Sequence, residues 1–438
     1  MPDGRALDGD RLALSGSAGE RRYFGTDGVR GIVGDDLTVG LVERLGKAAA
    51  LWSGRGRVFV GRDTRASGPE LEEAFARGVV AAGGNAVLAG VLPTPAVALL
   101  SLDLGVVITA SHNPPEYNGV KFFDADGHKL TDASEAEIEA LLDAPERGGG
   151  TIDRVDVATD SYLEHVVERF GPDLTGRRIV VDCANGAYSG IAPEAFEQLG
   201  AEVIAIGNEP DGTNINEGCG ATDLSALSGK VVESGSELGV AFDGDGDRML
   251  AVDGGGESVD GDQILAVLAL YLGVEVVAVT VMTNLGFHRL MEERGIRVLT
   301  TAVGDRYVLE ALRREGAVLG GEQSGHVIYL RDHVTGDGLA AALLLCAAIR
   351  GRTLAEAVAV MPRYAQAKEN VRVLSRKVPA AALAEADRLN DELAGAGRVL
   401  VRPSGTEPLV RVLGEAKTDE EARDLCARIA TLVQRELG

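Results

Sequence analysis

The sequence predicts an α/β protein with three related units, followed by a smaller α+β tail. Each unit repeats one order of elements: an apolar strand, a polar loop, a helix, a glycine turn and a second strand. Strand, helix and strand in this order form a βαβ unit, whose two strands run parallel. The strands are short and apolar throughout, which is typical of parallel sheets that are covered by helices on both faces.

The repeat can be followed along the chain. The first strands of the three units are expected at Arg57–Gly61, Ile179–Asp182 and Val276–Met282. The helices are expected at Glu70–Ala82, Ile191–Leu199 and Phe287–Arg294, and the second strands at Ala86–Leu92, Glu202–Ile206 and Arg297–Thr301. In open sheets of this kind ligands bind at the carboxyl ends of the strands, so we expect functional residues in the loops at those ends.

Segments rich in turn formers and charge divide the chain. They lie at Asp143–Asp153, Asp253–Ser258 and Met361–Arg363 and predict domains over residues 21–153, 154–255, 256–365 and 366–438. The tail is expected to contain strands at Glu369–Leu374, Arg398–Val401 and Leu409–Glu415 and helices at Ala381–Ala394 and Asp419–Glu436. Residues 1–20 are polar and have no apolar core, so we expect a disordered extension rather than a signal peptide.

Composition limits the partners of the protein. A formal net charge of −24 over 438 residues argues against nucleic acid and anionic membranes, because the field of the protein repels both. The most apolar stretches, Ile264–Thr280 and Leu339–Ile349, are interrupted by Glu275 or too short to span a bilayer, so we expect buried elements there. The four cysteines form no C-x-x-C motif, which suits reduced thiols in the cytoplasm.

The first motif that indicates chemistry is Ala110–Phe123, A-S-H-N-P-P-E-Y-N-G-V-K-F-F, which follows an expected strand at Gly105–Thr109. A serine in such a turn-rich loop usually caps the turn and does nothing more. The position of Ser111 at the carboxyl end of a strand nevertheless favours function, and no G-x-S-x-G elbow indicates a hydrolase. Lysine is rare in this arginine-rich chain, so Lys121 within a polar motif also favours function.

A second motif, Phe242–Arg248, reads F-D-G-D-G-D-R. A charged surface turn is the ordinary interpretation, but the intervening glycines let the backbone turn the carboxylates of Asp243, Asp245 and Asp247 onto one point. An EF-hand loop would need Gly at its sixth and Glu at its twelfth position, where this chain has Arg248 and Gly254. An aspartyl-phosphate phosphatase would need Thr two residues after its second Asp, where this chain has Asp247 or Met249. Three oxygen ligands with free positions best fit Mg²⁺ beside a phosphate oxygen.

Two further loops combine glycine with polar side chains. Gly320–His326, G-G-E-Q-S-G-H, mixes a carboxylate, an amide, a hydroxyl and an imidazole, which are the donors and acceptors that a sugar needs. Arg402–Glu407, R-P-S-G-T-E, follows a tail strand, and together with Arg411 it offers cations and hydroxyls to a phosphate. Each loop alone is weak evidence, but with the serine and the acidic loop they supply the parts of a phosphoryl-transfer site.

In this order the four loops resemble the signature regions of the α-D-phosphohexomutase superfamily. The matching segments read T-A-S-H-N-P, D-G-D-G-D-R, G-E-Q-S-G-H and R-P-S-G-T-E-P, and the resemblance covers the chain from Arg22 onward. Arg22–Gly31 (R-Y-F-G-T-D-G-V-R-G), Gln323 and Val303–Val308 (V-G-D-R-Y-V) are similar to the branch of the superfamily that acts on glucosamine phosphates.

The resemblance implies three related α/β domains with mixed, largely parallel sheets and a smaller C-terminal α+β domain around a central cleft, and it is compatible with a homodimer. It implies that phosphoserine at Ser111 gives its phosphate to glucosamine 6-phosphate. Glucosamine 1,6-bisphosphate then turns and returns its other phosphate, which releases glucosamine 1-phosphate for UDP-N-acetylglucosamine and cell-envelope synthesis. Glucosamine or glucose 1,6-bisphosphate would serve as the primer.

The resemblance also implies roles for individual residues. The ligands of Mg²⁺ would be the phosphorylated Ser111 and the carboxylates Asp243, Asp245 and Asp247. The catalytic residues would be Ser111, Lys121, Arg30, Arg248 and His326, and Lys121 needs a lowered pKa to act as a general acid or base. The sugar would be bound by Gly304, Asp305, Glu322 and Ser324. The phosphate that is not transferred would be bound by Arg402, Ser404, Gly405, Thr406 and Arg411.

Two alternatives stay open at this point. A phosphoglucomutase or phosphomannomutase of the same superfamily would differ mainly in its sugar, and Gln323 with Val303–Val308 argues against it. A phosphosugar-binding paralogue without turnover would keep the fold. The presence of Ser111, the three aspartates and Lys121 favours an enzyme instead.

Overall fold

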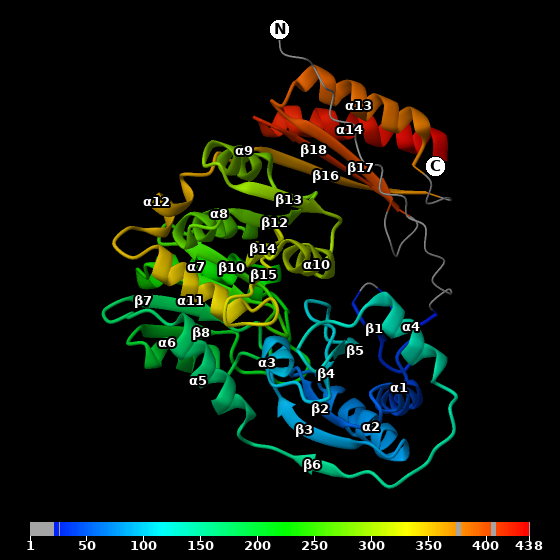
Figure 1. Cartoon of the computed structure of the whole chain (residues 1–438). Coiled ribbons are helices and arrows are strands. Elements are labelled where there is room, and N and C mark those ends of the chain that lie inside the picture. The colour runs from blue at the N-terminus through cyan, green and yellow to red at the C-terminus, as the bar shows by residue number, and fades with distance from the viewer. Residues whose placement is uncertain (1–21, 26, 374–377, 404–408, 438) are drawn as a thin grey trace.

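The computed structural model describes residues 22–25, 27–373, 378–403 and 409–437, so the extension expected over residues 1–20 lies outside the described part. Within these ranges the chain forms four β-sheets, each with its own helices (Figure 1). Blue and cyan elements build the first unit, green the second and yellow-green the third, whereas orange and red elements build the fourth (Figure 1). The four units therefore follow one another along the sequence.

The first sheet has six strands in the order β1-β5-β4-β2-β3-β6. Strand β2 is parallel to β3 and β4, whereas β5 is antiparallel to β4 and β1. The strands are β1 (Val29–Ile32), β2 (Arg57–Arg62), β3 (Asn85–Val91), β4 (Leu104–Ile108), β5 (Tyr117–Phe123) and β6 (Ile152–Arg154). The helices are α1 (Val39–Trp52), α2 (Gly68–Ala81), α3 (Thr94–Leu99) and α4 (Asp132–Ala140). Val58 and Val60 face the core of α1 and α2, whereas Phe59 joins the core shared with the second unit.

The second sheet repeats a parallel centre with an antiparallel margin, in the order β11-β10-β9-β7-β8. Strand β7 is parallel to β8 and β9, and β10 is antiparallel to β9. The strands are β7 (Arg178–Asp182), β8 (Glu202–Ile206), β9 (Leu238–Phe242), β10 (Met249–Asp253) and β11 (Ser258–Val259). The α-helices are α5 (Ala158–Phe170), α6 (Ala192–Gln198) and α7 (Ser225–Ser234), with a short 3₁₀ turn at Gly220–Thr222.

The third sheet has the order β13-β12-β14-β15 and the same plan. Strand β12 is parallel to β13 and β14, and β15 is antiparallel to β14. The strands are β12 (Val276–Thr280), β13 (Arg297–Thr301), β14 (Leu319–Gly321) and β15 (Val327–Tyr329). The helices are α8 (Gly261–Leu272), α9 (Leu285–Glu293), α10 (Asp305–Glu315), α11 (Gly338–Ala348) and α12 (Leu354–Val358).

The fourth sheet is antiparallel, in the order β16-β18-β17, and has its own small core. Its strands are β16 (Ala365–Arg372), β17 (Arg398–Pro403) and β18 (Leu409–Ala416). Helices α13 (Ala380–Leu393) and α14 (Asp419–Leu437) cover one face, where Val371, Val399 and Val412 are buried. Side chains alternate between the faces of a strand, so the residues between these valines point to the opposite face.

The first three sheets place a functional loop at the same point, between the last parallel strand and its antiparallel neighbour. This loop joins β4 to β5, β9 to β10 and β14 to β15, and it contains Ser111, the three aspartates and Glu322 respectively. The βαβ repeat predicted from the sequence is confirmed, and β8 and β13 have the predicted bounds. The antiparallel strands were not predicted as part of the repeat, because each pairs with a strand on the other side of a functional loop.

The apolar stretches contribute buried elements, as predicted: α8 and β12 in the first stretch and α11 in the second. Ten of the eleven residues of α11 are buried, and α8 begins with a capping box in which Asp260 and Gln263 exchange hydrogen bonds. No helix in the described ranges is both long and apolar enough to cross a membrane. All four cysteines are buried and free.

Candidate active site

Ser111 begins the loop that follows β4 and is almost completely buried. Its Oγ donates a hydrogen bond to Oδ2 of Asp243 at 2.5 Å, and Nδ1 of His112 lies 3.2 Å from the same oxygen. Its backbone N–H donates to Oγ1 of Thr109 at 2.9 Å. The backbone of Ser111 is left-handed, with φ of 53°, a conformation that a residue with a Cβ adopts only when its surroundings enforce it.

A buried arginine, Arg65, enforces this loop conformation. Its guanidinium donates to the backbone oxygens of Ser111 (3.0 Å), Asn113 (2.7 Å) and Tyr117 (2.9 Å), and to that of Pro114. Its Nε donates to Asp63 at 2.9 Å, and Oγ1 of Thr109 donates to the same carboxylate oxygen at 2.6 Å. Our sequence reasoning missed Arg65, although its loop follows the carboxyl end of β2, where a functional role was expected.

The acidic loop packs closely against the backbone of the serine loop. Asp243, Asp245 and Asp247 are buried, and one oxygen atom of each lies within 4.8 Å of the others. A Cβ on Gly244 would lie 2.7 Å from the backbone oxygen of Ser111, and one on Gly246 would lie 2.4 Å from the ring of Tyr188. The glycines of the motif are therefore required by close packing as well as by the turn.

The electrostatics of the three carboxylates differ. Burial, reinforced by the charges of Asp245 and Asp247, raises the pKa of Asp243 to about 8, although Arg248 and the Ser111 hydrogen bond oppose this. Burial would also raise the pKa of Asp247, but Lys121, His326 and Arg248 together hold it well below its usual value. One oxygen each of Asp245 and Asp247 is buried without a hydrogen bond, which leaves acceptors for a cation.

Lys121 on β5 occupies the centre of this cluster. Its Nζ lies 2.7 Å from Asp245, 3.2 Å from Asp247 and 3.2 Å from Asp27. Burial favours the neutral amine, but the three carboxylates outweigh it and raise the pKa of Lys121 well above its usual value. The lowered pKa that a role as general base requires is therefore not found: Lys121 is an ammonium group in this arrangement.

Three residues of the first unit complete the charge network. Asp27 contacts Arg30 and accepts a hydrogen bond from Lys129 at 2.7 Å, and Lys129 also contacts Asp305 of the third unit. Burial would raise the pKa of Asp27, but Lys121, Lys129 and Arg30 hold it well below its usual value. Asp27 and Lys129 were missed by the sequence reasoning, although Asp27 lies within the quoted Arg22–Gly31 segment.

The third unit brings Glu322, His326, Gly304 and Asp305 to the same side. His326 lies between two carboxylates, with Nδ1 3.6 Å from Asp247 and Nε2 3.5 Å from Asp305. Burial lowers the pKa of His326, but the two carboxylates raise it above its usual value overall. Oε1 of Glu322 accepts a hydrogen bond from the backbone N–H of Gly304 at 3.0 Å, and Ser324 is exposed in the same loop.

Arginines approach from the second and fourth units. Burial disfavours the charge of Arg248, but Asp243, Asp247 and Glu322 raise its pKa above the usual value. Arg402 and Arg411 are direct partners across β17 and β18, and burial together with Arg411 lowers the pKa of Arg402 while Glu322 opposes this. Three further predicted residues lie outside the described part of the chain, namely Ser404, Gly405 and Thr406.

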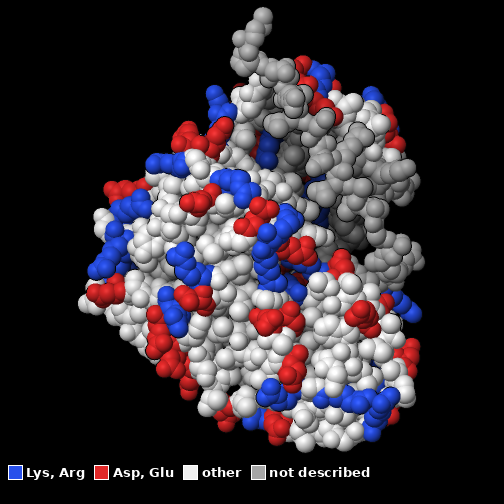
Figure 2. All heavy atoms as spheres, viewed as in Figure 1, with Lys and Arg blue, Asp and Glu red and all other residues white. Residues whose placement is uncertain are grey.

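The neighbouring His112 is neutral at pH 7. Burial and the cations Arg248 and Arg30 lower its pKa to about 4. Arg30 of the first unit and Arg248 of the second both lower the pKa of His112, so the two units share one electrostatic environment around Ser111. Figure 2 shows basic and acidic side chains side by side along the hollow between the lower part of the molecule and the parts above it.

Four family models match the chain in succession. Phosphoglucomutase/phosphomannomutase alpha/beta/alpha domain I matches residues 21–148, domain II matches 160–256, domain III matches 260–364, and the C-terminal domain matches 356–432. The chain belongs to the phosphoglucomutase/phosphomannomutase family. The three α/β/α models of this family cover most of the first three sheets, and its C-terminal model covers the antiparallel sheet.

Curated family members resemble this chain over nearly its whole length. The phosphoglucosamine mutase of Thermobifida fusca is 50% identical over 447 residues, covering 95% of this chain and 99% of the relative. That of Streptomyces coelicolor is 49% identical, with coverages of 95% and 100%. A solved phosphoglucomutase/phosphomannomutase family protein from Burkholderia thailandensis is 27% identical, with a TM-score of 0.80 and coverages of 94% and 97%. The N-acetylphosphoglucosamine mutase of Aspergillus fumigatus, solved with GlcNAc-6P and magnesium, is 19% identical, with a TM-score of 0.70 and coverages of 94% and 96%, and shares the fold.

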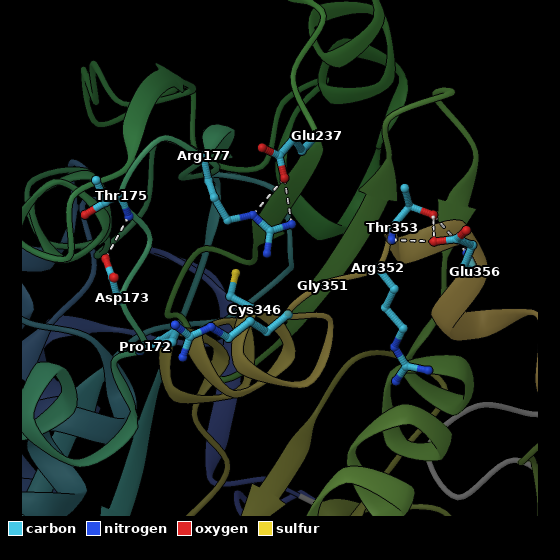
Figure 3. A pocket seen from close by; sticks show the side chains of 11 residues that line it. Pro172, Asp173, Thr175, Arg177, Glu237, Cys346, Gly351, Arg352, Thr353 and Glu356 are labelled. Carbon is cyan, nitrogen blue, oxygen red and sulfur yellow. Dashed lines mark hydrogen bonds and ion pairs between the residues drawn. The ribbon is translucent and has the colours of Figure 1, made fainter.

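A pocket of about 540 Å³ lies away from the site of this family (Figure 3). Its lining residues, such as Arg177 and Glu237, precede β7 and β9, whereas the acidic loop follows β9. The pocket therefore lies at the amino-terminal ends of the strands of the second sheet, whereas the acidic loop lies at their carboxyl ends. Arg177 and Glu237 face each other there with an N–O distance of 2.7 Å, so part of the charge in the pocket is already neutralised (Figure 3).

Proposed function

We propose that the protein is a phosphoglucosamine mutase, which interconverts glucosamine 6-phosphate and glucosamine 1-phosphate. The observation that carries this proposal is the contact between Ser111 and Asp243, at the point where the serine loop meets three buried carboxylates. Relatives named phosphoglucosamine mutase at 50% and 49% identity support the choice of sugar. The enzyme would cycle through phosphoserine at Ser111 and glucosamine 1,6-bisphosphate.

The acidic loop suits a magnesium ion. Hard oxygen ligands, close spacing and buried oxygens without a hydrogen bond on Asp245 and Asp247 are what such a cation requires. Asp243, Asp245 and Asp247 would hold Mg²⁺ together with an oxygen of phosphorylated Ser111. When bound, the ion would supply positive charge that neutralises the phosphate during transfer.

The remaining residues arrange charge and protons around the transfer. The sugar hydroxyl attacks the phosphorus, the bond from phosphorus to Oγ of Ser111 breaks, and the hydroxyl gives up its proton. In its neutral form His326, held between Asp247 and Asp305, would accept that proton. Arg30, Arg248 and Lys121 would stabilise the negative charge of the phosphate. The raised pKa of Lys121 favours its ammonium form, which suits charge stabilisation, and its predicted acid/base role stays a prediction.

Substrate would lie across the third and fourth units. Gly304, Asp305, Glu322 and Ser324 would contact the sugar, since Glu322 and Gly304 are already joined by a hydrogen bond that orients them. Arg402 and Arg411, with the loop that contains Ser404, Gly405 and Thr406, would hold the phosphate that is not transferred. The same cradle would hold either phosphate, because the intermediate must turn between the two transfers.

The setting of the reaction follows from the same features. Four free cysteines suit the reducing cytoplasm, and the net charge of −24 disfavours nucleic acid as a partner. Ser111 would receive its first phosphate from glucosamine or glucose 1,6-bisphosphate.

An activity assay tests the proposed function. The Mg²⁺-loaded enzyme, primed with glucose 1,6-bisphosphate, is given the 6-phosphates of glucosamine, glucose and mannose in parallel, and each 1-phosphate is quantified. We expect the highest kcat/KM for glucosamine 6-phosphate. A preference for glucose or mannose would assign the protein to another branch of the family, and no turnover of any of them would leave only a binding role.

A further inference from the structure

The open face of the fourth sheet contains a basic pocket next to the third unit. A cavity of about 160 Å³ is lined by Met282, Lys368, Asn370, Leu400, Arg402, Arg411, Val412 and Leu413. At roughly 30 Å³ per water molecule the cavity has room for about five waters, and therefore for a phosphate group. Asn370, Arg411 and Arg402 form one row across the three strands. Lys368 lies two residues before Asn370 on β16 and therefore on the same face.

A chain of hydrogen bonds fixes the surroundings of Lys368, and it starts at the buried carboxylate of Glu415. Glu415 accepts from the backbone N–H of Leu285 at 2.8 Å and pairs with Arg398 at 2.5 Å. It also accepts from Nε2 of Gln366 at 3.1 Å, and the backbone oxygen of Met282 lies 3.4 Å from the same nitrogen. Both partners can only accept, so the amide of Gln366 must present its NH₂ group to them and its oxygen to the other side.

The orientation of the Gln366 amide fixes that of the Gln323 amide, which in turn contacts Lys368. The oxygen of Gln366 accepts from Nε2 of Gln323 at 2.9 Å, so the oxygen of Gln323 faces away from Gln366. Nζ of Lys368 donates to this oxygen at 2.7 Å. An ammonium has three N–H donors, and Gln323 takes only one of them. Among the described residues no carboxylate lies within ion-pair distance of Lys368, and its exposed ammonium keeps N–H donors that can reach a ligand.

We propose that Lys368 is a third cation that binds the untransferred phosphate, beside Arg402 and Arg411, and that Gln323, which lines the neighbouring cavity together with Lys368, is a positioning residue that fixes the ammonium at the border of the 160 Å³ pocket. This inference rests on the proposed function, because it concerns the phosphate of that substrate. It also explains Gln323 differently from a sugar contact: its side chain joins the loop between β14 and β15 to the fourth unit.

Two substitutions measure the effect on binding. Lys368→Met removes the charge and keeps the length of the side chain, so we expect roughly 10- to 100-fold weaker binding of glucosamine 6-phosphate, equal to about 1.4–2.8 kcal/mol. Lys368→Arg should bind within a few-fold of wild type. Gln323→Leu should weaken binding less, and the double variant should bind no more weakly than Lys368→Met, because the second residue acts through the first.

The experiment is calorimetric titration of the full-length, Mg²⁺-loaded protein with glucosamine 6-phosphate and, separately, with inorganic phosphate. Lys417→Met is the matched control, since Lys417 lies at the same junction but does not line the 160 Å³ pocket. Thermal unfolding checks that every variant is folded. Wild-type binding by Lys368→Met, or equal weakening in Lys417→Met, would overturn the inference.

A separate measurement distinguishes this inference from the proposed function. Wild-type turnover of glucosamine 6-phosphate is recorded first. If turnover is absent but Lys368→Met still weakens the binding of inorganic phosphate, the proposed function fails and the assignment of Lys368 stands. If turnover is present and neither ligand responds to Lys368→Met, the proposed function stands and the assignment of Lys368 fails.

Discussion

At the scale of single residues, Ser111 combines a reactive position with an unfavourable backbone. Its φ of 53° costs a residue with a Cβ about 1–2 kcal/mol relative to an ordinary conformation. Glycine does not carry this cost. The strain and the function of Ser111 can therefore be separated by comparing two substitutions at this one position.

Ser111→Ala and Ser111→Gly should both lose mutase turnover, because both remove the oxygen that would carry phosphate. Ser111→Gly should be at least as stable as Ser111→Ala, because relief of the backbone strain offsets the added flexibility of the unfolded chain. Turnover with bisphosphate present and denaturant unfolding of both variants check these expectations. Undiminished turnover in either variant would remove Ser111 from the mechanism.

The residue scale also shows where sequence reasoning reached its limit. Ser111 and the three aspartates stand in motifs whose residue types already specify their chemistry, and the structure brings them together. Asp27 and Lys129 are single charged residues whose types specify no chemistry. Only the fold places Asp27 beside Lys121 and Lys129 beside Asp305. The raised pKa of Lys121 likewise depends on carboxylates from two separate segments, the acidic loop and the segment around Asp27, which the sequence alone does not place around it.

At the scale of elements, the loop after β4 depends on Arg65 more than on its own residues. Arg65→Lys keeps the positive charge beside Asp63 but cannot reproduce the five-donor fork that holds the backbone oxygens. We expect a loss of about 2–4 kcal/mol in unfolding free energy and slower transfer of phosphate from bisphosphate to Ser111. Denaturant titration and the rate of Ser111 phosphorylation measure both effects.

Arg62→Lys is the control for this prediction. Arg62 lies on β2 near Arg65 but is partly exposed and pairs with Glu72 at 3.4 Å. We expect its substitution to change stability by less than about 1 kcal/mol. If both variants behaved alike, the cradle of Arg65 would not hold the serine loop.

A pH-dependent element lies where α8 meets α9. Oδ2 of Asp262, in the first turn of α8, accepts a hydrogen bond from the backbone N–H of Asn284 at 2.8 Å. Burial, together with the charge of Asp260, raises the pKa of Asp262 to about 7. A raised pKa means that the stability it contributes is complete below pH ~4 and is lost as the pH rises toward about 7.

Asp262→Asn should remove this pH dependence, because an amide keeps the acceptor without the charge. Relative to wild type, the variant should therefore be more stable at pH 8 than at pH 5, by on the order of 1 kcal/mol or more. Denaturant unfolding at the two pH values, with Asp260→Asn in parallel, provides the measurement. A difference that is constant with pH would show that Asp262 is already charged in the folded protein.

The positions of helices and strands could be predicted from the sequence more fully than the pairing between strands. The βαβ repeat follows from local patterns of apolar residues and glycine, and it reappears in all three α/β units. The antiparallel strands β5, β10 and β15 each depend on a partner strand beyond a functional loop. Such pairing is set by tertiary contacts, so periodicity within one segment does not reveal it.

At the scale of the whole molecule, we expect phosphate binding by the fourth unit to affect the rate of phosphoryl transfer between the first and second units. Arg402→Ala should raise KM strongly and also lower kcat, because binding of the remote phosphate orients the reacting hydroxyl. Glucosamine 1,6-bisphosphate should escape during turnover, leaving Ser111 dephosphorylated. Steady-state kinetics, bisphosphate in solution and the phosphorylation state of Ser111 are the measurements, and added bisphosphate should partly restore the rate.

An unchanged KM without leakage of bisphosphate would contradict this prediction and leave the fourth unit a structural cap. Arg388→Ala is a suitable control, because Arg388 lies on α13 and pairs with Glu385 on the helical side of the unit. We expect its kinetics to match those of wild type.

The contacts that join distant parts of the chain also determine when, during synthesis, the protein becomes able to accept phosphate at Ser111. Ser111 and Asp243 are 132 residues apart in sequence, and Lys129 and Asp305 are 176 apart. At roughly 5–20 residues per second, a ribosome needs about 9–35 s to make the second of these intervals. A nascent chain should therefore remain unable to accept phosphate long after its first domain has formed. In refolding from denaturant, the far-ultraviolet signal should recover before phosphate acceptance does.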